Sequence, residues 1–107
     1  MLNVIKTSAE FRKVYQDGNK LVLSCFVIYY IVHQSGGIKY GVTVTKKLGN
    51  AVTRNRIKRR LRAVVMAAFS KIPNDLNLEI VLVARKYSLT ADFEQMLKMF
   101  KNGLNIS

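Results

Sequence analysis

The sequence has few of the residues that build metal sites and covalent cross-links. It contains one cysteine, Cys25, and one histidine, His33, so it predicts no internal disulfide and no zinc site made of its own side chains. A single cysteine within an apolar stretch is typical of a reducing, intracellular compartment, and we expect a cytoplasmic protein. We interpret His33 as a solvent-exposed or hydrogen-bonded imidazole at the end of a strand, not as a catalytic group.

Acidic residues are also scarce, which limits the chemistry that the chain could perform. Only Asp92 and Glu94 lie close together, and side chains two positions apart on a helix do not converge on one substrate. The glycines lack the spacing of a phosphate-binding loop. We therefore expect no catalytic residue, no cofactor or metal bound by protein side chains, and no activity of the protein alone. The acidic residues are Glu10, Asp17, Asp75, Glu79, Asp92 and Glu94.

Long apolar runs are absent as well. The longest run, residues 26–32, is far shorter than the roughly 18 apolar residues that indicate a membrane span, and residues 1–6 lack the apolar core of a secretory signal. No repeat or linker interrupts the chain. We expect one soluble domain over residues 1–107, with no membrane partner and with enough apolar residues, 50%, for an ordinary core.

Positive charge is what the sequence has in excess. Eighteen Lys and Arg against six Asp and Glu give a net charge of +12 and a pI near 10.2, above the value of about 9 that points to nucleic-acid binding. No acidic residue lies between Asp17 and Asp75, and residues 46–62 carry eight Lys and Arg. These charges repel one another unless a polyanion neutralises them, so we expect a nucleic-acid partner. A solvated charged face and a helix that binds membranes or calmodulin-type partners are the alternatives.

The first half of the chain predicts a helix followed by strands. Thr7 and Glu10 have the spacing of a capping box, and Gly18 ends the helical pattern. Residues 21–32 and 38–45 are rich in β-branched and aromatic residues, with a Ser-Gly-Gly turn between them. We expect these two segments to pair as an antiparallel hairpin, with a small extra strand near residues 21–23.

The second half predicts a basic helix, a buried strand and a last helix. Residues 52–69 have an apolar stripe at helical spacing on one side and cations elsewhere, residues 79–84 are a nearly continuous apolar run, and Thr90 caps the final helix. A turn is expected at residues 73–75. The order α-β-β-β-α-β-α predicts an α+β fold, a single-sheet α-β sandwich. The apolar stripe consists of Ile57, Leu61, Val64, Val65 and Ala68.

Residues 43–62 contain a specific motif. After a strand that ends in Val-Thr-Lys-Lys, the chain reads Gly-Asn-Ala-Val, then Thr53, then Arg-Asn-Arg-Ile-Lys-Arg. This resembles the signature of the protein subunit of bacterial ribonuclease P, with Thr45 in place of the usual Ser. The similarity extends to both ends of the chain, through residues 10–11, 15–18, 26–29 and 83–85.

The resemblance implies a fold like a domain of ribosomal protein S5, with a left-handed crossover through the basic helix where general rules assign a right-handed one. It implies 5′ maturation of precursor tRNA by an RNA subunit that holds the active site and requires Mg²⁺. One protein would bind that catalytic RNA and the 5′ leader. The residues expected to face the RNA subunit are Lys46, Lys47, Arg54, Asn55, Arg56, Lys58, Arg59, Arg60 and Arg62. Those expected to line the leader cleft are Phe11, Tyr15 and Tyr29.

Two other classes remain open at this stage. A ribosomal or ribosome-assembly protein of the same fold would share the basic helix but need no leader cleft. A DNA-binding module would place the helix in a major groove, which is disfavoured because Ile57 and Leu61 are needed against the sheet. Spacing alone places Phe11 and Tyr15 in the core, whereas the resemblance places them in the cleft. The chain departs from the family in having Tyr15 where Phe is usual and only Lys6 as a cation before the first helix.

Overall fold

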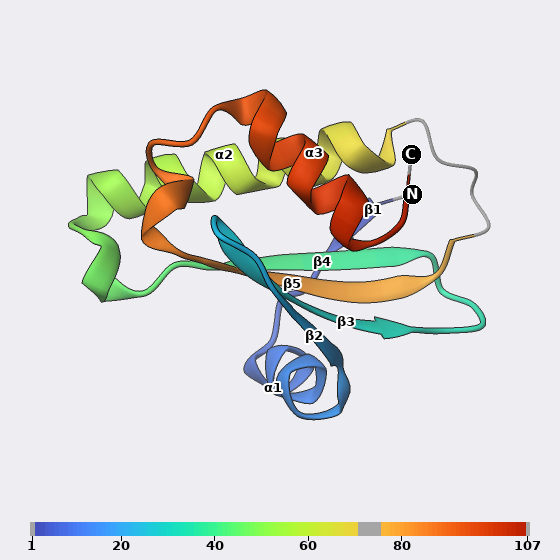
Figure 1. Cartoon of the computed structure of the whole chain (residues 1–107). Coiled ribbons are helices and arrows are strands. Elements are labelled where there is room, and N and C mark those ends of the chain that lie inside the picture. Colours follow the sequence, from blue (N-terminus) through green and yellow to red (C-terminus); the bar gives the residue numbers. More distant parts are fainter. Residues whose placement is uncertain (1, 71–75, 107) are drawn as a thin grey trace.

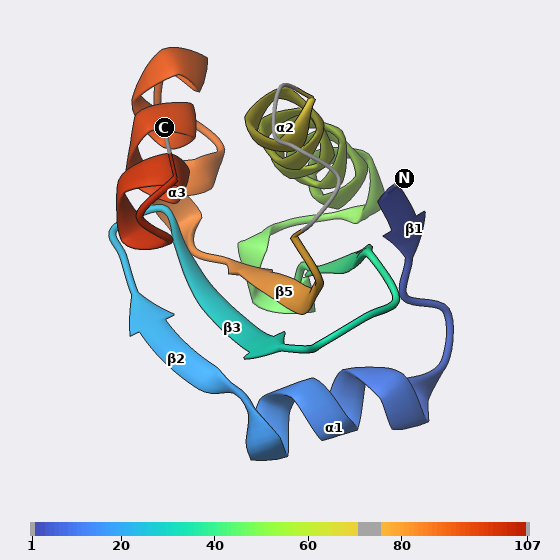
Figure 2. The same cartoon turned by 90° about the vertical axis from the view of Figure 1, so that its right-hand side faces the viewer.

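A mixed five-stranded sheet separates one helix from two others (Figures 1 and 2). The computed structural model describes residues 2–70 and 76–106. Helix α1 covers one face of the sheet, and α2 and α3 cover the other. Two short 3-10 helices, η1 (Lys46–Leu48) and η2 (Lys86–Ser88), follow β4 and β5. The elements are β1 (Leu2–Val4), α1 (Ser8–Asp17), β2 (Asn19–Val22), β3 (Phe26–Val32), β4 (Ile38–Thr43), α2 (Ala51–Phe69), β5 (Leu78–Ala84) and α3 (Phe93–Gly103).

Strand β5 lies in the middle of the sheet, whose order is β1-β4-β5-β3-β2. It pairs antiparallel with β3, with Ala84 opposite Phe26, and parallel with β4, with Leu78 opposite Ile38. The predicted hairpin between the segments that form β3 and β4 is therefore wrong. The physical reason is that β5 is apolar on both faces, so it is best buried with a strand on each side.

The turn between β3 and β4 contacts the start of β5 instead of joining two paired strands. Gly36 and Gly37 both have positive φ, at 100° and 70°, a conformation that glycine adopts without steric cost. The Gly37 amide donates to Asn77 Oδ1 at 2.8 Å, and the Leu78 amide donates to the Gly37 carbonyl at 3.1 Å. The turn therefore holds β3 and β4 apart, and β5 lies between them and pairs with both.

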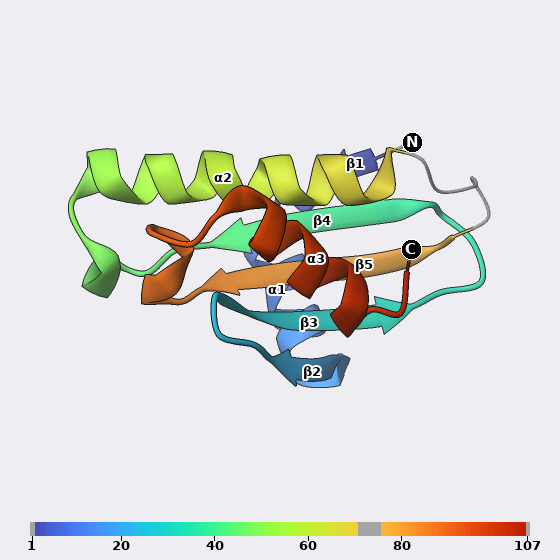
Figure 3. The ribbon, with the colours of Figure 1, turned by 45° about the horizontal axis from the view of Figure 1, so that its top comes forward.

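Helix α2 connects the parallel neighbours β4 and β5 by a left-handed crossover (Figure 3). In that view both strands point to the left, α2 passes in front of the sheet, and β5 lies below β4. A connection that leaves β4, passes in front of the sheet and returns to a strand on this side is left-handed. The handedness implied by the family resemblance is confirmed, against the general preference for right-handed connections. The crossover places the amino terminus of α2 and the carboxyl ends of β4 and β5 at one end of the molecule.

The predicted helices are present, with differences at their ends. The capping box of α1 is confirmed, because Thr7 Oγ1 accepts from the Glu10 amide at 3.2 Å and the Glu10 carboxylate accepts from the Thr7 amide at 3.2 Å. The predicted cap Thr90 is wrong: η2 and a turn occupy that segment, and α3 begins after Asp92. Strand β1 was not predicted, because a segment of three residues is too short to show a periodic pattern. The turn predicted at residues 73–75 lies outside the described residues.

The sheet has a large apolar core on one side and a small one on the other. On the α2 and α3 side, Phe26 and Phe100 are 0% exposed and Cys25 is buried among them. On the α1 side the fully buried cluster is only Ile5, Val14 and Val81. The partly buried residues that pack on this smaller cluster are Phe11, Tyr15, Tyr29, Ile31 and Val83.

Candidate nucleic-acid interface

Helix α2 begins at a defined cap, which fixes the direction of its cations. Asn50 Oδ1 accepts from the Thr53 amide at 2.9 Å, and the Arg54 guanidinium donates to the Gly49 carbonyl at 3.4 Å. Asn50 is therefore the cap. Asn55, which we expected to face the RNA subunit, is exposed on the helix surface.

The solvent face of α2 is basic and uncompensated. Its exposed polar residues lie opposite the stripe that packs on the sheet, and Lys58 and Arg54 are half-buried beside them. Val52, Asn55, Lys58, Arg59 and Arg62 line a shallow groove there. Within residues 2–70 and 76–106 the ion pairs are His33 with Glu79 and Lys39 with Glu10, so no cation of α2 has an acidic partner in this part of the chain. The exposed polar residues of this face are Asn55, Arg56, Arg59 and Arg62.

Arg60 differs from the other cations of the helix. Its guanidinium donates to the carbonyl of Ala91, just before α3, and its Nε is buried without a hydrogen-bond partner among the described residues. Arg60, which we expected to face the RNA subunit, is therefore partly buried against the segment before α3. The cause is α3, which packs against α2 and brings the segment before it within reach of this side chain.

Lys46 and Lys47 are exposed on η1, between the end of β4 and the start of α2 (Figure 3). No side-chain hydrogen bond or ion pair holds either lysine within the described residues. They extend the positive surface of α2 past the end of the sheet, as the sequence predicts.

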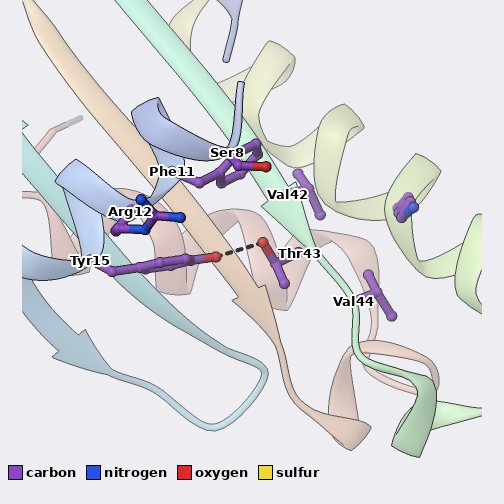
Figure 4. A pocket seen from close by; sticks show the side chains of 8 residues that line it. Ser8, Phe11, Arg12, Tyr15, Val42, Thr43 and Val44 are labelled. Atoms are coloured by element: carbon purple, nitrogen blue, oxygen red, sulfur yellow. Dashed lines mark hydrogen bonds between the residues drawn. The ribbon is translucent and has the colours of Figure 1, made fainter. Parts of the chain in front are cut away.

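A pocket opens on the other side of the sheet, between α1 and the edge of β4 (Figure 4). The Phe11 ring lies over Gly41, where a Cβ would be 2.6 Å from two ring carbons, so only glycine allows this approach. The hydroxyl groups of Tyr15 and Thr43 lie 2.7 Å apart across the pocket floor. The pocket is lined by Ser8, Phe11, Arg12, Tyr15, Val42, Thr43, Val44 and Lys58.

The three predicted leader residues cluster, but not all reach the pocket. The Tyr15 and Tyr29 rings meet edge to face with centroids 5.0 Å apart, and the Phe11 and Tyr15 centroids are 6.4 Å apart. Phe11 and Tyr15 line the pocket, whereas Tyr29 packs behind Tyr15 with Lys20 Nζ 5.7 Å from its ring centroid. All three rings are partly buried, so they are neither fully buried core residues nor fully exposed surface residues.

Among the five residues of this pocket that sequence reasoning missed, Ser8 and Arg12 lie on α1. Both could have been found from helical spacing, because positions 8, 12 and 15 lie on one face of α1. Lys58, which we had assigned to the RNA-subunit face, borders both the pocket and the groove on α2. It therefore joins the two surfaces around the edge of β4.

The remaining ionisable groups near α1 stabilise the fold. The Thr7 hydroxyl donates to Glu10 at 3.0 Å and lowers the pKa of that carboxyl, and backbone amides of residues 6 and 7 add to the effect. Lys39 Nζ lies 3.5 Å from Glu10 and links α1 to β4. His33 Nε2 is 2.6 Å from Glu79 Oε1, which confirms a hydrogen-bonded imidazole. In the part of the chain that the structure describes, no three His, Cys, Asp or Glu side chains are grouped so that they could hold a metal.

An uncompensated basic helix beside a pocket with aromatic walls, on a small α+β sheet, defines a nucleic-acid-binding protein. The family model described as Ribonuclease P matches residues 2–106. The chain belongs to this family of ribonuclease P protein components, which makes it part of a ribonuclease P holoenzyme that processes tRNA and associates with ribonuclease P RNA.

Individual relatives agree with this assignment. The ribonuclease P protein component of Streptococcus pneumoniae (strain Hungary19A-6) is 34% identical over 103 residues, which cover 96% of this chain and 82% of the relative. The RNase P protein of Staphylococcus aureus has 31% identity and a TM-score of 0.78, covering 95% of this chain and 92% of that one. The RNase P protein from Thermotoga maritima, at 23% identity and a TM-score of 0.79 over 98% of each chain, supports the fold.

These comparisons favour the ribonuclease P interpretation over the ribosomal and DNA-binding alternatives. None of the helices within residues 2–70 and 76–106 is long and apolar enough to cross a bilayer.

Proposed function

We propose that this protein binds ribonuclease P RNA through the solvent face of α2 and binds the 5′ leader of precursor tRNA in the pocket between α1 and β4. The RNA subunit carries out the cleavage that yields the mature 5′ end, in a cytoplasmic particle with one protein per RNA. The observation that carries the proposal is the position of Lys58, which borders both surfaces. A leader and the catalytic RNA would then meet around the edge of β4.

The α2 face suits a structured RNA partner. Arg56, Arg59 and Arg62 are exposed on one side of a helix whose other side is fixed to the sheet, so their guanidinium groups are available to phosphates. Lys46 and Lys47 supply further point charges at the end of the same surface. Contacts of this kind give affinity that falls steeply with salt.

The pocket suits an unpaired strand. Phe11 and Tyr15 offer aromatic faces, and Arg12 and Lys58 offer positive charge at its rim. Bases of any identity stack on aromatic rings, at about 1 to 3 kcal/mol per base, so the pocket would accept leaders of many sequences. The edge of β4 is open here, because β1 pairs only with residues 38–40.

We assign the chemistry to the RNA subunit, as the family resemblance implies. The described residues contain no group of three or more His, Cys, Asp or Glu side chains that could hold a metal ion. Mg²⁺ would be held by the RNA holoenzyme. Rigorously RNA-free protein should leave precursor tRNA intact, and detectable cleavage by it would contradict this assignment.

The leader site is tested by two substrates with one variant. Phe11→Ala, assembled with ribonuclease P RNA, should weaken binding of precursor tRNA with a leader of several nucleotides by about 1 to 3 kcal/mol. Binding of mature tRNA should not change, because only the leader reaches the pocket. Tyr29→Ala should act in the same direction, through the support that Tyr29 gives to Tyr15.

A matched control is Phe93→Ala, which truncates a partly buried phenylalanine on the opposite side of the sheet. It should lower stability without distinguishing the two substrates. Equal losses for both substrates with Phe11→Ala would mean that this ring is a core residue and that the leader binds elsewhere.

A further inference from the structure

The turn after β5 displays an aromatic residue that neither proposed site uses. Tyr87, on η2, is 54% exposed, and Lys86 Nζ lies 5.7 Å from its ring centroid. Arg85 and Lys86, the two preceding residues, are also exposed. An exposed ring among cations, on a protein that binds RNA, has the composition of a platform for an unpaired base.

This turn is held in place by several hydrogen bonds. Ser88 is 0% exposed and its hydroxyl donates to the Arg85 carbonyl at 2.7 Å. The Ala91 amide donates to the Tyr87 carbonyl at 2.9 Å, and Arg85 Nη1 donates to the Leu23 carbonyl at 2.8 Å. The backbone that carries Tyr87 is therefore fixed before any partner arrives, which reduces the entropy lost on binding.

Arg60 connects this turn to the basic helix. Its guanidinium donates to the carbonyl of Ala91, the residue whose amide bonds to Tyr87, and η2 packs against α2. Because β4 and β5 are parallel, η1 and η2 follow the same end of the sheet, so Tyr87 shares that end with Lys46 and Lys47 (Figure 3). Asp92 and Glu94, exposed at the start of α3, place negative charge close to this turn in the sequence.

We propose that Tyr87 is a stacking platform for an unpaired nucleotide of ribonuclease P RNA, and that Arg60 is the positioning residue that holds this platform beside the α2 face. The inference rests on the proposed function of α2. The RNA subunit is favoured over the leader because η2 packs against α2, whereas the leader pocket lies between α1 and the β4 edge. Arg60 thus serves binding through the turn and not through a phosphate.

A fluorescent reporter tests the contact directly. The chain contains no tryptophan, so Tyr87→Trp introduces a single indole that can also stack. Titration with ribonuclease P RNA should quench its emission at the concentrations where the RNA binds. Val32→Trp is the control, because Val32 is 65% exposed and pairs with Leu78 at the opposite end of β5. Unchanged emission from the Tyr87→Trp protein with RNA bound, or quenching by precursor tRNA alone and not by the RNA subunit, would overturn the proposal.

The affinity of variants for ribonuclease P RNA distinguishes a failure of this inference from a failure of the proposed function on which it rests. Tyr87→Ala should weaken binding of ribonuclease P RNA about 5-fold to 150-fold, the equivalent of about 1 to 3 kcal/mol per stacked base, while Tyr87→Phe should bind as the wild type does. Loss of affinity in Arg59→Ala but not in Tyr87→Ala would refute the platform alone. If neither variant lost affinity, the α2 interface itself would be refuted.

The role of Arg60 has its own readout. In the Tyr87→Trp protein, Arg60→Ala should lower the fluorescence anisotropy of the free protein's indole and reduce quenching by saturating RNA. Arg59→Ala in the same background should leave that anisotropy unchanged, since Arg59 is exposed and makes no hydrogen bond to the turn. Equal anisotropy in all three proteins would overturn the positioning role.

Discussion

The two sides of the sheet carry similar aromatic clusters that differ in how far helices cover them. On the α2 and α3 side, the Phe100 ring meets Phe26 and Phe69 edge to face, with centroids 6.2 and 5.6 Å apart. On the α1 side, Tyr15 and Tyr29 meet edge to face at 5.0 Å. The first cluster is closed over by two helices, whereas a single ten-residue helix leaves the second partly open. Coverage, and not ring geometry, is what distinguishes the two clusters.

The largest effect should come from the closed cluster. Phe100→Ala removes a ring that is 0% exposed, so we expect a loss of about 3 to 5 kcal/mol in the free energy of unfolding, through lost burial and the cavity left behind. Urea unfolding followed by circular dichroism measures it. A loss below that of Phe11→Ala would contradict the contrast between the two sides.

The next largest effect should come from a test of the partly open cluster of Phe11, Tyr15 and Tyr29. Gly41→Ala places a Cβ against the Phe11 ring and should displace that ring, at about 1 to 3 kcal/mol of stability. Precursor tRNA with a leader should bind more weakly, and mature tRNA should bind as before. Gly103→Ala is the control: its new methyl would lie 3.3 Å from the flexible end of Leu23, on the other side of the sheet. Wild-type leader affinity in Gly41→Ala would mean that the position of Phe11 does not matter.

The sequence alone predicted the features that depend on residues close together in the chain. It failed for features that depend on which distant segments pair or pack. The capping box at Thr7 and the apolar stripe of α2 follow from spacing, and both are confirmed. The position of β5 between β3 and β4 depends on which strands meet across the chain, and the turn at Gly36 is compatible with either pairing. The family resemblance supplied the left-handed crossover, which the local pattern does not contain.

The candidate site shows the same division. The basic residues of α2 form a helical face that spacing predicts, but Arg60 lies in that pattern and still points to Ala91, because the sequence of α2 does not determine where α3 packs. Phe11 and Tyr15 have core spacing, yet both are only partly buried on the face of the sheet that α1 alone covers. Arg12 was available from spacing and was missed.

A smaller effect should separate two neighbouring arginines. Arg59→Ala should weaken binding of ribonuclease P RNA and flatten the dependence of log K on log salt by about 0.7 to 0.9, as one phosphate contact is lost. Arg60→Ala should leave that slope unchanged and lower stability by about 1 kcal/mol, the typical net value of a hydrogen bond. Binding measured between 50 and 200 mM salt, about the range where such slopes are resolved, is the test. Equal slope changes would show that Arg60 contacts phosphate after all.

The smallest effect concerns the cap that orients α1. A hydrogen bond from the Thr7 hydroxyl lowers the pKa of Glu10, so folding favours its ionised form. Its contribution to stability is complete above the ordinary Glu pKa, about 4.3, and is lost as the pH falls through the lower pKa of the folded protein. Glu10→Gln should therefore lower Tm at neutral pH, with a gap to wild type that closes in acid. In a Thr7→Ala background, which removes the hydroxyl, the same substitution should have a much smaller effect on the pH dependence. A gap that stays constant with pH would mean that the carboxylate charge does not stabilise the start of α1.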